Sequence, residues 1–358
     1  MRSASGTSPT PDEPVGDAPP RTRTGASERP LAEAYDTALL DLDGVVYAGG
    51  EAVPHAVRAL EGARGRGLGL AYVTNNAART PRTVAAHLTE LGVPAEPEDV
   101  ITSAQAVARL IAEDVPPGAP VLAIGAEGLR VALEERGLRV VESADDGPAA
   151  VVQGYGGPGM PWERLMEAAV AVQRGVRWYA SNTDLTIPSG RGIAPGNGAA
   201  VEVVRIATRA VRPAPEPRVA GKPLPPMHRE SILRTGARRP LVVGDRLDTD
   251  IEGAYAGGVD SLLVLTGVTD AAQLLAAGPE CRPTFVARDL RGLLVPHPEV
   301  RALAEGFVCE GWTATATGSE LELNGSGDPL DGLRALCAAA WTDPRALDPG
   351  KALARLGL

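Results

Sequence analysis

The sequence predicts an α/β protein with a parallel central sheet, because three separate apolar runs each end in small or polar residues. The runs cover residues 38–40, 70–73 and 241–243. Short apolar runs rich in Val, Leu and Ala are typical of strands buried on both faces. Open α/β sheets bind ligands at the carboxyl ends of their strands. The polar residues that follow the runs are therefore the first candidates for a functional site.

Two aspartates follow the first run. Asp41 and Asp43 are separated by one residue, and Gly44 turns the chain just beyond them. Because side chains two positions apart point to the same face of a strand, the two carboxylates are expected to project together. Carboxylates that close repel each other, and a hard cation is the usual remedy. The pair predicts a Mg²⁺ site with a nucleophilic carboxylate, and the alternative is a solvated acidic turn.

The second run ends in Thr74, Asn75 and Asn76, which offer a hydroxyl and two amides. Thr80 and Pro81 then suit the N-cap and first position of a helix that stops near residue 92. Polar donors between a strand end and a helix start suit an oxyanion such as phosphate. An ordinary strand-to-helix loop is the alternative.

A lysine is the third candidate. Gly221 permits a close backbone approach just before Lys222, and Pro223 ends the extended segment. A lysine placed there can offset charge on a carboxylate and on a transferring phosphoryl group. An ordinary surface lysine is the alternative.

The third run meets Gly244 and then several carboxylates. Asp245 lies at the predicted strand end, and Asp250 opens a helix that runs toward Tyr255. Acidic residues also cap helix N-termini, and Asp248 is the candidate for that alternative.

Together the four segments, D-x-D, Thr-Asn-Asn, Lys and G-D-x-x-x-x-D in this order, resemble the haloacid dehalogenase-superfamily phosphatases. The similar branch includes the N-acetylglucosamine-phosphate, 4-nitrophenyl-phosphate, phosphoglycolate and pyridoxal-phosphate phosphatases. The resemblance covers about residues 35 to 295. It implies a Rossmann-like three-layer core, an inserted α/β cap of the C2 type, and Mg²⁺-dependent hydrolysis of a small phosphorylated metabolite.

The resemblance also implies roles for single residues. Asp41 would be the nucleophile that forms an aspartyl-phosphate, and Asp43 the general acid and then the general base. Lys222 would bridge Asp41 and the phosphoryl group. The remaining implied roles concern the ion and the phosphate: Mg²⁺ held by the Asp41 carboxylate, the Asp43 carbonyl and the Asp245 carboxylate; phosphate held by Thr74 and the Asn75 amide with Asn76 close by; and the metal site or its waters oriented by Asp250.

The stretch between Thr74 and Lys222 is far longer than one crossover needs, so an insertion is expected there. Strands are predicted there at 121–125, 149–154 and 176–180, and they alternate with helices at 126–137 and 161–175. Core is therefore expected at 34–108 and 213–297, with the cap at 109–212. Asn182 and Asp184 match the substrate-facing segment of the family's cap, and are either specificity residues or groups that cap a loop.

The last 61 residues, 298–358, lie beyond the phosphatase pattern. Strands are predicted at 312–315 and 320–323, and an amphipathic helix at 329–342, in a small α+β unit. The unit is too small to be stable alone, so it is expected to pack on the phosphatase or on a second copy in a homo-oligomer. It resembles the acetyltransferase-like (GNAT-like) tail of bacterial phosphatases of this branch that hydrolyse glycerol 3-phosphate, which favours that substrate.

Composition limits the remaining classes. A net charge of −10 argues against a general nucleic-acid binder. The sequence contains no run of 18 apolar residues, so no membrane span is expected. Three dispersed cysteines, Cys281, Cys309 and Cys337, suit a reducing cytoplasm. Residues 1–33 are rich in Pro, Ser, Thr and Gly and predict a disordered tail.

Other functions stay open on the sequence alone. Phosphoglycolate, pyridoxal phosphate, 4-nitrophenyl phosphate and nucleoside monophosphates are alternative substrates. A D-x-D metal-dependent glycosyltransferase would use Asp41 and Asp43 but leave Thr74, Lys222 and Asp245 unexplained. A non-catalytic regulatory binding module is the third class.

Overall fold

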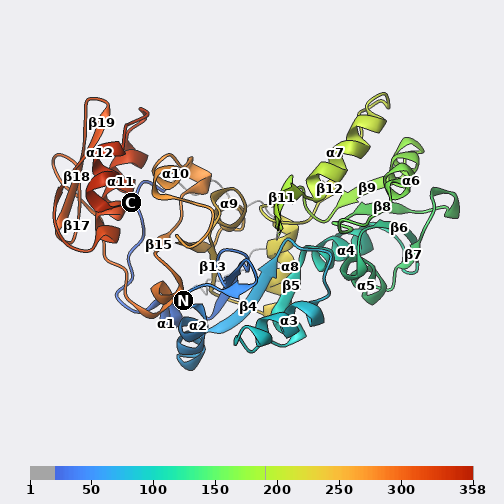
Figure 1. Cartoon of the computed structure of the whole chain (residues 1–358), viewed down its shortest axis with the longest axis horizontal. Coiled ribbons are helices and arrows are strands. Elements are labelled where there is room, and N and C mark those ends of the chain that lie inside the picture. The colour runs from blue at the N-terminus through green and yellow to red at the C-terminus, as the bar shows by residue number, and fades with distance from the viewer. Residues whose placement is uncertain (1–20, 190, 358) are drawn as a thin grey trace, which may run out of the picture.

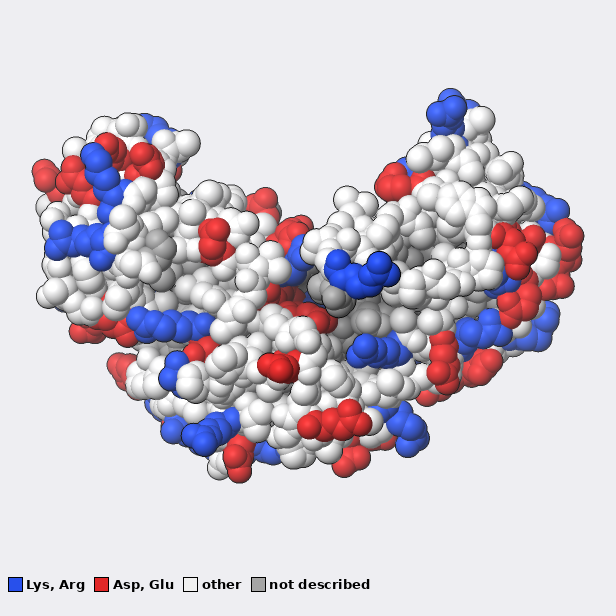
Figure 2. Space-filling view, in the orientation of Figure 1, with Lys and Arg blue, Asp and Glu red and all other residues white. Residues whose placement is uncertain are grey.

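The computed structural model describes residues 21–189 and 191–357, which form three parts side by side. In Figure 1 the core lies in the middle, the insertion that was expected to form a cap (here termed the cap) on the right, and the C-terminal segment on the left. Figure 2 shows a broad concavity along the upper outline of this view, between the cap and the C-terminal segment, with charges of both signs interspersed near it.

The core contains a six-stranded parallel sheet, as predicted. Its strands stand in the order β15–β14–β13–β1–β4–β5. Strand β1 is central, with Leu39 paired to Val242 on one side and to Ala71 on the other. The bounds are β1 Thr37–Leu40, β4 Gly69–Thr74, β5 Val100–Thr102, β13 Pro240–Gly244, β14 Asp260–Val264 and β15 Phe285–Ala287. The central position of β1 puts Asp41 between the ends of β4 and β13.

Helices cover both faces of this sheet because its residues alternate between two hydrophobic clusters. Leu40 and Tyr72 face the first cluster, under α2 (Ala56–Gly65) and α3 (Pro81–Glu90). Thr80 caps α3 by accepting a hydrogen bond from the Thr83 N–H, as predicted. Smaller elements complete the core: α1 Leu31–Ala34, β2 Tyr47–Ala48, β3 Glu51–Ala52, a π-helix at Leu247–Ile251, α9 Glu252–Ala256 and α10 Ala271–Leu275.

The inserted cap has its own parallel sheet, in the order β12–β9–β8–β6–β7. The strands and helices predicted between residues 121 and 180 are all present. Strand bounds are β6 Pro120–Ile124, β7 Arg139–Val141, β8 Ala150–Gln153, β9 Arg177–Ala180 and β12 Arg218–Val219. The helices are α5 Glu127–Glu135, α6 Trp162–Gln173 and α7 Asn197–Thr208, and β10 Thr186–Ser189 pairs with β11 Gly192–Pro195. Strand β12 lies beyond residue 212, because two residues of the returning chain pair with β9.

Cap and core share one hydrophobic cluster. Helix α4 (Ser103–Asp114) and helix α8 (Pro225–Thr235) cover the second face of the core sheet. The cluster joins Val73 and Ile111 to Leu129 of the cap. Burial of apolar surface from both parts therefore holds the cap on the core.

The predicted disordered tail at 1–33 has to be shortened. Residues 1–20 lie outside the described residues, whereas residues 21–33 pack against the core. Leu31 is fully buried, Arg21 forms a 3.0 Å ion pair with Asp260, and Ser27 forms a β-bridge with His297. An apolar side chain and specific long-range partners thus order a stretch whose composition alone predicted disorder.

The C-terminal segment is a four-stranded antiparallel sheet with two helices. Strands β18 (Trp312–Thr317) and β19 (Glu320–Gly325) and helix α11 (Pro329–Thr342) match the prediction. Three short elements were not predicted: β16 Arg301–Ala302, β17 Phe307–Cys309 and α12 Gly350–Leu356.

This segment packs on the core of the same chain, one of the two expected locations. One hydrophobic cluster joins Leu263 and Val286 of the core sheet to α11. The Trp341 indole N–H donates to the Leu274 carbonyl at 3.1 Å, and the Arg334 guanidinium donates to the Val286 carbonyl at 2.7 Å. Helix α11 therefore supplies a layer over the β14–β15 end of the sheet.

We predict that Trp341→Ala destabilises the whole protein by about 3–5 kcal/mol, because it empties a buried site at this junction. Trp341 is 4% exposed, whereas Trp162 on the cap is 65% exposed and provides the matched control. Trp162→Ala should change the free energy of unfolding by no more than about 0.5 kcal/mol. Denaturant unfolding measures both, and equal small effects would contradict the packing role of α11.

Candidate active site

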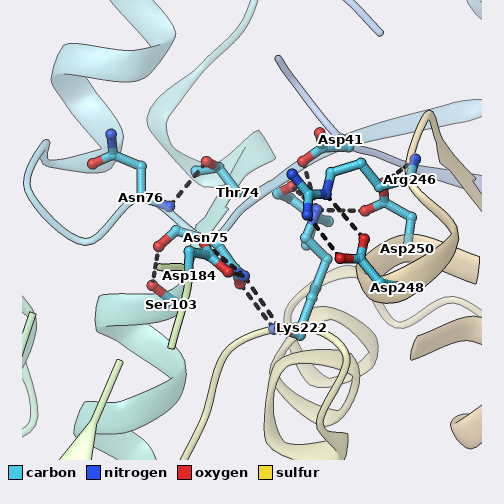
Figure 3. Close-up of polar contacts among 11 residues, drawn as sticks. Asp41, Thr74, Asn75, Asn76, Ser103, Asp184, Lys222, Arg246, Asp248 and Asp250 are labelled. Atoms are coloured by element: carbon cyan, nitrogen blue, oxygen red, sulfur yellow. Dashed lines mark hydrogen bonds and ion pairs between the residues drawn. The ribbon is translucent and has the colours of Figure 1, made fainter. Parts of the chain in front are cut away.

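The predicted polar residues meet at one edge of the core sheet. Asp41 follows β1, Thr74 ends β4 and Asp245 follows β13, and these three strands are neighbours. The Asp41 N–H donates to the Val243 carbonyl at 2.8 Å. The hydrogen-bond ladder between β1 and β13 therefore continues as far as Asp41, the candidate nucleophile. Figure 3 shows Asp41, Lys222 and Asp250 pointing toward one another.

Lys222 lies between two carboxylates. Its ammonium contacts Asp41 Oδ1 at 2.5 Å and Asp250 Oδ1 at 2.7 Å, and it donates to the Val73 carbonyl at 3.2 Å. Burial lowers the pKa of Lys222, but the two carboxylates outweigh burial and hold that pKa above its usual range. Burial raises the pKa of Asp41, and Lys222 opposes that shift. The lysine is therefore a charged group fixed against Asp41.

A divalent ion fits beside this pair. Oxygens of Asp41, Asp245 and Asp250 lie within 4.8 Å of one another. Asp245 Oδ1 is buried without a hydrogen-bond partner among the described residues, whereas its Oδ2 accepts the Val268 N–H at 2.7 Å. Burial raises the pKa of Asp245 to about 6, although that hydrogen bond lowers it. An unpartnered carboxylate oxygen beside Asp41 is the donor that Mg²⁺ prefers.

Asp250 is placed differently from Asp245. Its Oδ1 accepts from Lys222, and its Oδ2 accepts the Arg246 N–H at 3.2 Å. Burial raises the pKa of Asp250 to about 6, against the lowering effect of Lys222. Because both oxygens already have donors, Asp250 fits an orienting role better than a ligand role. Asp248 lies in the first turn of the π-helix, as the alternative expected, but makes no capping hydrogen bond, and its carboxylate pairs with the Arg246 guanidinium at 2.8 Å.

Asp43 lies on the open side of the site. The residue is exposed, yet surrounding protein raises the pKa of its carboxyl, and Arg79 opposes that rise. The sequence analysis did not single out Arg79, which follows Thr-Asn-Asn in the same loop. Gly44 allows the turn here, because it has a φ of +83° and a Cβ at this position would lie 2.6 Å from Asp245 Oδ2.

The loop after β4 is shaped by its own side chains. Thr74 Oγ1 accepts the Asn76 N–H at 3.1 Å. The Asn76 side chain accepts the N–H groups of Ala78 and Arg79, at 2.8 and 3.3 Å. Figure 3 shows the Asn76 side chain pointing away from Asp41 and Lys222. Asn76 therefore holds the loop, and Thr74 lies nearer the carboxylates.

Asn75 connects this loop to the cap. Its side-chain NH₂ donates to Asp184 Oδ2 at 3.2 Å, and its backbone carbonyl accepts from Asn182 Nδ2 at 2.7 Å and from Ser103 Oγ at 2.6 Å. The structure thus brings both predicted cap residues to the site, where they contact Asn75. Ser103, the first residue of α4, was missed because no local pattern distinguishes it.

Known proteins and family models are similar to this chain over both parts of the core. The family model described as haloacid dehalogenase-like hydrolase matches residues 38–139, and a related HAD-hydrolase-like model matches 219–293. A D-glycerol 3-phosphate phosphatase of Mycobacterium tuberculosis is 45% identical over 327 residues, 89% of each chain. The chain belongs to the haloacid dehalogenase-like hydrolase family. The resemblance inferred from the motifs is therefore confirmed.

Other relatives of this hydrolase extend the comparison. The crystal structure of a glycerol phosphate phosphatase from Mycobacterium tuberculosis in complex with magnesium aligns with a TM-score of 0.82 at 42% identity, covering 92% of this chain and 99% of that one. An acid sugar phosphatase of Staphylococcus haemolyticus is 36% identical over 258 residues, 72% of this chain and 94% of its own. A GCN5-related N-acetyltransferase-like model matches residues 309–358.

We predict that Gly221→Ala destabilises the hydrolase by about 1–3 kcal/mol, because the crowded site must shift to admit a methyl group. An added Cβ would lie 2.6 Å from the Ser181 carbonyl and 2.7 Å from Asn75 Oδ1. Gly65, which ends α2, has no heavy atom within 4 Å of that position and is the control. Gly65→Ala should leave stability unchanged or raise it slightly. Thermal unfolding compares the two, and an unaffected Gly221→Ala protein would show that the site is loosely packed.

Proposed function

We propose that this hydrolase is a Mg²⁺-dependent phosphomonoesterase that works through an aspartyl-phosphate on Asp41, with glycerol 3-phosphate as the favoured substrate. The observation that carries the proposal is the buried Lys222, held between Asp41 and Asp250 beside the unpartnered oxygen of Asp245. A phosphate dianion repels a carboxylate nucleophile, so such a site has to supply positive charge.

The proposed ligands of Mg²⁺ are the Asp41 carboxylate, the Asp43 carbonyl and the Asp245 carboxylate. When bound, the ion offsets negative charge on the nucleophile and on the phosphoryl oxygens. Asp250 orients this arrangement by holding Lys222 and the Arg246 N–H. The magnesium complex of the Mycobacterium tuberculosis structure supports this cofactor.

The proposed chemistry has two displacements at phosphorus. An Asp41 oxygen bonds to phosphorus while the bond to the ester oxygen breaks, and Asp43 gives its proton to the leaving alkoxide. Asp43 then accepts a proton from water, whose oxygen attacks phosphorus and releases Asp41 and inorganic phosphate. The raised pKa of Asp43 suits its first role, because it favours the protonated acid.

The phosphate oxygens are proposed to lie against Lys222, the Thr74 hydroxyl and the backbone N–H of Asn75. The lysine stabilises the loose transition state of phosphoryl transfer mainly through its charge and position. A glycosyltransferase would leave the pairing of Lys222 with Asp41 unexplained, and a purely regulatory module would not need it.

Three findings favour glycerol 3-phosphate. The relative that is 45% identical bears the name D-glycerol 3-phosphate phosphatase, and its 89% coverage extends past the shared phosphatase core. The glycerol phosphate phosphatase structure aligns over 92% of this chain, and the GNAT-like model matches the C-terminal segment. The relatives named acid sugar phosphatase and 4-nitrophenylphosphatase match only 72% and 74% of this chain. Those ester classes are the alternative substrates.

A cytoplasmic location is part of the proposal. The three cysteines are free, with Cys309 and Cys337 buried, as suits a reducing compartment. Among residues 21–189 and 191–357, no helix is long and apolar enough to cross a bilayer.

We predict that Asp41→Asn lowers the turnover of phosphomonoesters by at least about 10⁴-fold, because an amide cannot form the acyl-phosphate. The wild-type protein should form an acid-stable phosphoenzyme with labelled substrate, and the variant should not. Asp145→Asn is the control, since the Asp145 side chain is 81% exposed on the cap. Normal turnover by Asp41→Asn would refute the mechanism.

The substrate is tested with a panel of phosphomonoesters in Mg²⁺ buffer. We expect the highest kcat/KM for glycerol 3-phosphate, and loss of activity with EDTA that added Mg²⁺ restores. A higher kcat/KM for phosphoglycolate, pyridoxal phosphate or a nucleoside monophosphate would identify that ester as the preferred substrate. The proposed mechanism would be unaffected.

A further inference from the structure

We propose that Asp184 of the cap is a positioning residue for the catalytic lysine, and that it acts through the side chain of Asn75. The inference rests on the proposed role of Lys222. It differs from the expectation that Asp184 selects the substrate directly.

Asn75 holds the backbone of Lys222 at two points. Its Oδ1 accepts the Lys222 N–H at 2.8 Å, and its Nδ2 donates to the Lys222 carbonyl at 3.2 Å. The side-chain amide thus pairs with one whole residue of the returning chain, 147 positions away. Since the ammonium of Lys222 must reach both Asp41 and Asp250, a shift of its backbone moves the charge that faces the nucleophile.

Asp184 fixes which way the Asn75 amide faces. Its two oxygens lie 3.3 and 3.2 Å from Asn75 Nδ2. If the amide were flipped, its oxygen would face both a carboxylate and the Lys222 carbonyl, and its NH₂ would face the Lys222 N–H. Each contact would then place two acceptors or two donors against each other. The carboxylate therefore reinforces the orientation in which Asn75 pairs with Lys222.

The rest of the cap loop holds Asp184 in place. The Asp184 N–H donates to Asn182 Oδ1 at 3.2 Å, and the Asp184 carbonyl accepts the Gly198 N–H at 2.9 Å. Asn197 Nδ2 donates to the Asn182 carbonyl at 2.7 Å. In Figure 3 the Asp184 side chain lies against Asn75, beside the loop that follows β4.

The position suits a supporting residue better than a phosphate ligand. A carboxylate in direct contact with a phosphate dianion would repel it. Asp184 instead presents both oxygens to the Asn75 amide. Partners that orient a catalytic group in this way typically contribute about 10- to 100-fold to activity.

The test compares Asp184→Ala and Asp184→Asn with Thr183→Ala, a change at the neighbouring exposed residue. We measure kcat and KM with glycerol 3-phosphate and with 4-nitrophenyl phosphate. Asp184→Ala should lower kcat about 10- to 100-fold, by the same factor for both esters, with KM within about twofold of wild type. Asp184→Asn keeps an acceptor oxygen for Asn75 and should recover most of kcat, and Thr183→Ala should match wild type.

A double-mutant cycle tests whether Asp184 acts through Asn75. Because one residue works through the other, Asp184→Ala should cost little further kcat once Asn75→Ala is present. Additive losses would overturn the proposal. So would a raised KM with unchanged kcat, or a change of more than about tenfold in the relative kcat/KM of the two esters, because each indicates direct substrate contact. If Asp184→Ala fails to fold, Asp184→Leu, which fills a similar volume but offers no acceptor oxygen to Asn75, replaces it in both measurements with the same expected losses.

Lys222→Met distinguishes a failure of the proposed mechanism from a failure of the positioning role of Asp184. An active Lys222→Met protein would refute the role of the lysine, and with it both the proposed mechanism and the positioning of Lys222. An inactive Lys222→Met beside a fully active Asp184→Ala would refute the positioning role alone. Inactive Lys222→Met with the expected loss in Asp184→Ala supports both.

Discussion

The site depends on the balance between several carboxylates and one buried ammonium group. Asp41, Asp245 and Asp250 gather at one sheet edge with Asp43 nearby, and Lys222 neutralises only part of their charge. Carboxylates collected in this way are costly unless cations accompany them. Desolvation by the surrounding protein raises the pKa of all four aspartates, and Lys222 opposes each rise. A divalent ion would offset the excess negative charge that remains. The Asp245 oxygen without a hydrogen-bond partner indicates where that ion would bind.

The three parts of the fold serve this arrangement in different ways. The parallel sheet brings Asp41, Thr74 and Asp245 to neighbouring strand ends. The insertion carries the chain away and returns it with Lys222 beside Asn75, while a cluster shared through α4 and α8 holds cap and core together. The C-terminal segment packs over β14 and β15, where it completes a hydrophobic layer. This placement favours a structural role for that segment.

The sequence predicted the parts that short-range patterns encode. Apolar runs followed by Asp41, Thr74 and Asp245 identified three core strands and their site residues, and helix α11 was predicted from its apolar face. What it missed depends on partners distant in the chain. Strand β12 has two residues and exists because β9 lies beside it, and the ordering of residues 21–33 depends on contacts such as that of Ser27 with His297. The Asp184–Asn75 contact spans 109 positions and follows from the cap's placement.

The most direct measurement is a crystal structure of the protein with Mg²⁺ and beryllium fluoride, a mimic of an acyl-phosphate. The account predicts the fluoride adduct on an Asp41 oxygen, an ion bound to Asp41 and Asp245, and the Lys222 ammonium in contact with the adduct. An adduct on another side chain, or an ion held by Asp250 with Asp245 left free, would contradict it.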